Sequence, residues 1–188
     1  MADHPDFTEK QLATRLAYDG QLLKVREDTV LLPDGKTARR EYIQHPGAAI
    51  IIPLLDAATV LLERQFRYPL GRHFYELPAG KINPGEDALT TAQRELIEEC
   101  GYEARSWRHL ATLHPCIGYS DERIEIFWAS GLIYVGHQRD HGEFLEVVEM
   151  SVADSILAVR DGEITDGKTI TALMWADKIA SGSWRVPD

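Results

Sequence analysis

The sequence predicts an α/β protein, in which a sheet of apolar strands packs with amphipathic helices. Two apolar runs rich in Ile, Val and Leu, residues 48–55 and 59–65, are short and separated by a polar connection, as core strands are. After Asp87 the apolar residues recur at helical spacing. The tail over residues 151–179 has the pattern of two helices with a break near Asp161-Gly162. Together these patterns indicate the α/β class.

The first element is a predicted β-hairpin over residues 22–45. Leu23, Val25 and Val30 lead into Pro33-Asp34-Gly35-Lys36, which is a turn signal. At 188 residues the chain is long enough for one substantial core but short for two ordinary domains. We therefore expect an N-terminal β extension, residues 1–45, attached to one main domain, residues 46–188.

The helix after Asp87 is the clearest element. Its apolar side consists of Leu89, Ala92, Leu96 and Cys100. Gly101 can end it in a left-handed conformation. Two further strand-like segments follow, residues 107–113 and 123–129, with a loop rich in Pro, Gly and Ser between them.

Composition and charge exclude several classes of protein. With 44% hydrophobic and 27% charged residues the chain has the composition of a globular domain, and its longest apolar stretch is too short to cross a membrane. The formal net charge of −10 argues against a nonspecific nucleic-acid binder, although divalent metal ions could bridge this acidic protein to a phosphorylated ligand. Cys100 and Cys116 lack metal-type spacing and suggest no disulfide framework, which favours a cytoplasmic location.

Three glutamates share one face of the predicted helix. At 100° per residue Glu95 and Glu99 lie one turn apart, with Glu98 beside them. Like charges at this spacing repel by roughly 0.2–0.5 kcal/mol, which stability alone does not explain. Mg²⁺ would turn the repulsion into binding, because it takes carboxylate oxygens and keeps waters and phosphates in its other positions. For the glutamates alone, a solvated acidic face in which Arg94 pairs with Glu98 would be the better interpretation.

The fixed spacing around the glutamates decides between these interpretations. Residues 80–102 match the pattern G-x5-E-x7-R-E-U-x-E-E-x-G-U, where U is apolar, at every fixed position, from Gly80 through Glu86 to Gly101. Tyr102 at the final apolar position is the one soft departure. The sequence therefore resembles the Nudix hydrolase family, whose box this is.

Further strings extend the resemblance over roughly residues 20–175 to the ADP-ribose pyrophosphatase branch of that family. They include Arg64-Gln65-Phe66-Arg67-Tyr68-Pro69, Glu76-Leu77-Pro78-Ala79-Gly80, Gly118-Tyr119-Ser120-Asp121-Glu122 and Glu143-Phe144-Leu145-Glu146-Val147. The resemblance implies the Nudix α/β/α sandwich, with a mixed sheet between helices and an N-terminal β element. It also implies a homodimer, in which the β element supports the interface and each active site borrows residues from the partner.

The resemblance implies a set of metal ligands as well. The positions that match the family's Mg²⁺ ligands are the carbonyl of Ala79 and the carboxylates of Glu95 and Glu99, with Glu98 and Glu86 in support. Two or three Mg²⁺ ions are expected, with Mn²⁺ as an alternative. Arg94 would then orient the acids and would not be a substrate ligand.

In this branch a loop acid outside the box acts as general base or as a further metal ligand. Glu143 is the best match and Glu146 the second, and an ordinary exposed loop glutamate is the competing interpretation for either one. The positions that match substrate contacts are Arg64, Arg67, Glu76, Gly118, Tyr119 and Ser120. A planar guanidinium suits a phosphate, but an arginine that only caps a strand end would explain Arg64 or Arg67 equally well.

A competing motif lies near the C-terminus, where residues 162–169 satisfy the P-loop pattern G-x4-G-K-[ST]. A P-loop needs a buried strand before it, so that backbone N–H groups at a helix start can hold phosphate. Residues 156–160 have the pattern of a helix instead, and Glu163 and Asp166 would place carboxylates in the phosphate cradle. We therefore interpret this motif as a chance match.

The implied activity is Mg²⁺-dependent hydrolysis of the pyrophosphate of ADP-ribose to AMP and ribose 5-phosphate. A pyrophosphatase for another nucleoside diphosphate sugar such as GDP-mannose, or for a dinucleoside polyphosphate, is the alternative among enzymes. A non-catalytic Nudix module that senses ADP-ribose is the alternative of another class. The intact glutamates argue against the sensor, because a pure sensor has no need of a charged metal cluster.

Overall fold

The structure, a computed structural model, describes residues 4–138, 142 and 144–187. The chain divides into two compact units, Met1–Pro46 with Cys116–Glu122, and Gly47–Pro115 with Arg123–Asp188. No helix in the described part of the chain is both long and apolar enough to cross a membrane.

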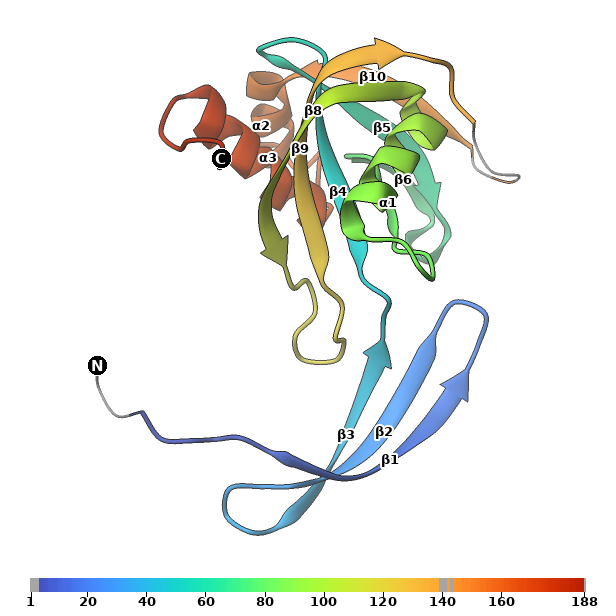
Figure 1. The fold of residues 1–188 in the computed structure, drawn as a ribbon, viewed down its shortest axis with the longest axis vertical. Helices are drawn as coiled ribbons and strands as arrows, with labels where there is room; N and C mark the ends of the chain where they lie inside the picture. Colours follow the sequence, from blue (N-terminus) through green and yellow to red (C-terminus); the bar gives the residue numbers. More distant parts are fainter. Residues whose placement is uncertain (1–3, 139–141, 143, 188) are drawn as a thin grey trace. The chain divides into compact units, whose positions relative to one another are not determined.

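The smaller unit contains a three-stranded antiparallel sheet (Figure 1). Its strands, in spatial order, are β1 (Lys10–Asp19), β2 (Lys24–Leu31) and β3 (Thr37–Gln44). The β2–β3 hairpin matches the one predicted, and its turn includes Gly35 at φ +83°, a conformation that favours glycine. Strand β1 was not predicted, and all ten of its residues are exposed.

The larger unit contains a seven-stranded sheet with the main order β10-β5-β4-β9-β8, in which β6 pairs with β5 and β7 pairs with β4. Its strands are β4 (Ala48–Leu54), β5 (Thr59–Arg67), β6 (Arg72–Glu76), β7 (Ala79–Lys81), β8 (Tyr102–Leu113), β9 (Ile124–Tyr134) and β10 (Leu145–Ser151). Strands β4 and β9 run parallel and the other pairs are antiparallel, so the sheet is mixed, as the resemblance implied.

Helices cover both faces of this sheet (Figure 1). They are α1 (Ala88–Glu95), followed directly by the π-helical turn η2 (Leu96–Cys100), then α2 (Val152–Arg160) and α3 (Gly167–Ala180), and a short 3₁₀ turn, η1 (Tyr68–Leu70), joins β5 to β6. Every residue of β4 is buried, because Ile50 and Ile52 pack on the side of α2 and α3 while Ile51 packs on the side of α1. The result is a sandwich of helices around a sheet.

Three strands of this unit were not predicted from the sequence, β6, β7 and β10. Strand β7 has only three residues, and β6 begins with the polar pair Arg72-His73. Strands β8 and β9 are also longer than the predicted segments. The predicted pair of C-terminal helices is present, and α2 occupies the position where a P-loop would require a strand.

Candidate active site

The helix of the glutamates begins and ends at residues suited to those positions. The side chain of Asp87 accepts a hydrogen bond from the backbone N–H of Thr90 at 2.7 Å and so caps the start of α1. The helix continues into the π-helical turn η2 and ends at Gly101, whose φ is +81°. Glu98 and Glu99 lie in the π-helical turn, a feature that recurs at functional sites.

Arg94 joins three of the acids. Its guanidinium donates to Glu86 at 3.0 Å, to Glu95 at 2.7 Å and to Glu98 at 2.8 Å. The hydrogen bond from Arg94 is the main reason that the pKa of Glu86 falls to about 2. Arg94 thus holds these carboxylates in place and keeps Glu86 ionised.

Glu95 and Glu99 are buried against the backbone of β7. The N–H of Ala79 donates to Glu99 Oε2 at 3.1 Å. A Cβ atom added at Gly80 would lie 1.7 Å from Glu95 Oε1, so the carboxylate occupies the space that only a glycine leaves open. Residues Glu95 and Glu99 retain 8% and 7% exposure, respectively. The glycine of the box is therefore required by the close approach of a carboxylate.

A fifth acid, Glu63 of β5, contacts Glu99 and was not predicted. It is fully buried, forms a hydrogen bond with the carboxyl group of Glu99 and accepts one from Cys100 Sγ at 3.4 Å. Its Oε2 has no hydrogen-bond partner among the described residues. Burial is the main cause that raises the pKa of both Glu63 and Glu99, and the neighbouring carboxyl group of Glu63 raises the pKa of Glu99 further. The sequence signal that could have identified Glu63 is its position directly after the apolar residues 60–62 of a predicted core strand.

The donor chemistry of this region fits a hard divalent cation. All candidate ligands are oxygens, and the acids outnumber Arg94, the cation that pairs with three of them. Within the described ranges no three His, Cys, Asp or Glu side chains already form a metal cage. The site is thus an acidic cluster held by Arg94 and β7, in which a metal would draw the carboxylates together.

A second cluster surrounds Glu76, at the end of β6. Arg67 donates to its carboxylate twice, at 2.6 and 2.8 Å, and Lys168 Nζ donates to both Glu76 and Asp166. Burial would raise the pKa of Glu76, but Arg67 and Lys168 outweigh it, so the pKa is lowered. These residues line a hollow together with Leu70, Phe74, Thr165 and Gly167.

The rejected P-loop motif has a structural role in this second cluster. Asp166 caps α3 through the N–H of Thr169, and the hydroxyl of Thr169 accepts from the N–H of Leu77 at 3.0 Å. Lys168 was not predicted as a site residue, because its string Asp166-Gly167-Lys168-Thr169 forms part of the motif that was rejected.

The remaining predicted residues belong to other elements of the two units. Arg64 and Glu146 face each other across β5 and β10 at 3.9 Å, with side chains 40% and 69% exposed. Glu143 lies outside the described residues. Gly118, Tyr119 and Ser120 belong to the smaller unit, where the carbonyl of Cys116 accepts from the N–H groups of Tyr119 and Ser120.

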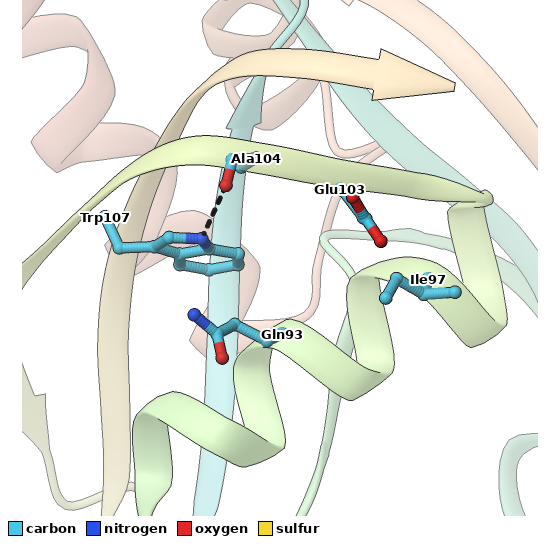
Figure 2. A pocket seen from close by; sticks show the side chains of 5 residues that line it. All are labelled: Gln93, Ile97, Glu103, Ala104 and Trp107. Carbon is cyan, nitrogen blue, oxygen red and sulfur yellow. Dashed lines mark hydrogen bonds between the residues drawn. The ribbon is translucent and has the colours of Figure 1, made fainter. Parts of the chain in front are cut away.

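Another hollow lies on the opposite side of α1 (Figure 2). Gln93 and Ile97 face Glu103, Ala104 and Trp107 of β8, and the indole N–H of Trp107 donates to the carbonyl of Ala104 at 3.2 Å. Gln93 precedes Glu95 by two residues, or about 200° of helix. This hollow is therefore separate from the acidic cluster.

Comparisons with known proteins identify the family and the fold. Residues 44–173 match the family described as NUDIX domain, and residues 9–43 match the nucleoside diphosphate sugar hydrolase N-terminal domain. An ADP-ribose pyrophosphatase from Bacillus subtilis is 35% identical over 89% of this chain and 91% of its own length. One from Mycobacterium tuberculosis is 32% identical over 97% of this chain and 88% of its own. A crystal structure of an ADP compounds hydrolase has the same fold, with a TM-score of 0.85, 22% identity and coverage of 97% and 100% of the two chains.

Proposed function

The chain belongs to the Nudix hydrolase family, and we propose that it hydrolyses the pyrophosphate of ADP-ribose to AMP and ribose 5-phosphate. The observation that carries the proposal is the placement of the box carboxylates, with Glu95 and Glu99 against β7 and Arg94 linking Glu86, Glu95 and Glu98. The relatives named ADP-ribose pyrophosphatase support this choice of substrate.

Nudix hydrolases generally use divalent metals such as Mg²⁺. When bound, such ions neutralise the pyrophosphate and activate the attacking water. In this chain the ligands would be the Ala79 carbonyl, Glu95 and Glu99, with Glu86 and Glu98 in support, and we propose two or three ions. Arg94 keeps Glu86 ionised and aims Glu95 and Glu98, so that the acids are ordered before the substrate arrives.

We propose that the hollow beside Glu76 contributes to substrate binding. The side chain of Arg67 is 43% exposed although its guanidinium is fixed by Glu76, so its outer edge can meet a phosphate oxygen at little entropic cost. Arg64, Gly118, Tyr119 and Ser120 are further proposed contacts.

For the general base we propose Glu143, with Glu146 as the alternative. The exposed carboxylate of Glu146 forms a distant ion pair with Arg64, which is compatible with either role. Glu143→Gln should lower kcat strongly and leave KM nearly unchanged, because the lost interaction belongs to the transition state. If Glu146→Gln shows this signature and Glu143→Gln behaves as wild type, the role belongs to Glu146.

We further propose that residues 1–45 form a dimerisation element and residues 46–188 the catalytic domain of a cytoplasmic homodimer. Strand β1 is exposed throughout and carries Leu12, Leu16 and Tyr18 on its surface, which an isolated sheet would leave in water. Light scattering at micromolar concentration should give twice the monomer mass, and Leu16→Glu should reduce it. A wild-type protein that is already monomeric would contradict this element of the proposal.

Product analysis over a panel of nucleotides tests the proposed activity. The panel contains ADP-ribose, GDP-mannose and a dinucleoside polyphosphate, each with Mg²⁺, with Mn²⁺ and with chelator. We expect AMP and ribose 5-phosphate from ADP-ribose at the highest kcat/KM, and no turnover with chelator. Preference for GDP-mannose or for the polyphosphate would reassign the substrate. Binding of ADP-ribose without turnover would identify a sensor.

A further inference from the structure

Glu63 is the one fully buried acid near the box that no cation touches in the described structure. Its partner across the β5–β6 ladder, Glu76, is neutralised by Arg67 and Lys168. Glu63 contacts Glu99 and Cys100 instead, and its Oε2 has no partner among the described residues. An apolar side chain would be the more stable choice at such a position, because a buried polar atom without a partner costs free energy.

We propose that Glu63 is a positioning residue for the metal ligand Glu99, an inference that rests on the proposed metal-dependent activity. Glu99 is held from two directions, by the N–H of Ala79 on β7 at 3.1 Å and by the carboxyl group of Glu63 on β5. Both supports belong to the sheet, whereas Glu99 belongs to the π-helical turn. Together they fix the orientation of its carboxylate relative to Glu95.

The hydrogen bonds of Glu63 are consistent with this role. Cys100 Sγ donates to Oε1 of Glu63 and fixes that group in turn. Partners that orient a metal ligand in this way affect metal affinity by about 10–100-fold in other proteins.

The test measures Mn²⁺ binding to the metal-free protein by electron paramagnetic resonance, together with Tm. Glu63→Leu removes the hydrogen bond and the buried polar atom, so Mn²⁺ affinity should fall at least about ten-fold while Tm stays equal or rises. Glu63→Gln keeps a donor for Glu99 and an acceptor for Cys100, and its affinity should stay near wild type. Leu61→Met, two residues away on the same face of β5, is the packing control and should leave affinity unchanged. Should Glu63→Leu fail to fold, Glu63→Met takes its place.

The possible outcomes separate this inference from the proposed function. Wild-type affinity in Glu63→Leu, with weak binding in Glu99→Gln, overturns the positioning role alone. Equal losses in Glu63→Leu and Leu61→Met assign the effect to packing and overturn it as well. If the wild-type protein binds no Mn²⁺, both the metal-dependent function and the positioning role fall.

Discussion

Glu63 and Glu76 face each other across two adjacent strands and are buried to similar depth, yet their surroundings differ. Arg67 and Lys168 neutralise the charge of Glu76 and lower its pKa. Glu63 meets another acid, Glu99, and burial raises the pKa of both. The first acid is neutralised by cations that the chain itself supplies. The second lies among other acids, whose excess negative charge a bound cation would neutralise. The comparison therefore separates a structural ion cluster from a candidate metal site.

The largest expected effect is on the acid-rich side. Glu99→Gln keeps the shape of the side chain and its contacts with Ala79 and Glu63, but removes a charge. We predict a fall in kcat of at least about 100-fold, the scale of a lost electrostatic contribution to catalysis, with little change in Tm. Steady-state kinetics on ADP-ribose measure this effect, with the exposed Glu103→Gln as control. Near-normal turnover of Glu99→Gln would contradict the assignment of the acid-rich cluster as the metal site.

The charge-balanced side should show its effect in stability. Glu76→Gln leaves Arg67 and Lys168 without their carboxylate, and hydrogen bonds to charged groups contribute roughly 1.5–3 kcal/mol. Since Arg67 is partly exposed, we expect a loss near the lower end, about 2 kcal/mol, in the free energy of unfolding by urea. Asp161→Asn breaks the exposed pair with Arg160 and should leave the free energy of unfolding almost unchanged. Equal losses of unfolding free energy in the two variants would contradict a stabilising role for the ion pairs of Glu76.

The same stabilisation should depend on pH in a defined direction. The pKa of Glu76 is lowered in the folded protein, so its contribution is present above the unfolded pKa of about 4.3 and is lost as pH falls through the folded pKa. The difference in unfolding free energy between wild type and Glu76→Gln should therefore be constant at neutral pH and shrink below about pH 4. A difference that grows on acidification would have the wrong sign for this ion cluster.

The contrast also shows what the sequence could predict. The helix of the glutamates, its end at Gly101 and the β2–β3 hairpin were predictable, because their signals are local and periodic. The contact of Glu63 with Glu99 was not, since it joins a strand to a distant helix through tertiary packing. Lys168 stood in a recognisable string but was assigned to a chance motif, because its partner Glu76 is remote in sequence. Sequence patterns thus leave out the long-range electrostatic contacts that a residue makes.

The smallest effect that we predict concerns the backbone on the acid-rich side. The carboxylate of Glu95 packs directly against the backbone of Gly80 in β7, with no side chain between them. Gly80→Ala would place a Cβ atom 1.7 Å from Glu95 Oε1, so the carboxylate must turn away and take its share of the metal site with it. We expect about a ten-fold loss of Mn²⁺ affinity, the lower end of what a misplaced ligand shell costs, measured by electron paramagnetic resonance.

Gly167→Ala is the matched control for Gly80→Ala. An added Cβ at Gly167 meets nothing within 4 Å, and the residue starts α3 beside the charge-balanced cluster. Its Mn²⁺ affinity should therefore equal that of wild type, and the helix should gain slightly from the alanine. If Gly80→Ala also binds Mn²⁺ with wild-type affinity, then Glu95 reaches the metal from another direction. The close contact with β7 would in that case belong to the fold, as the cluster around Glu76 does, and not to the metal site.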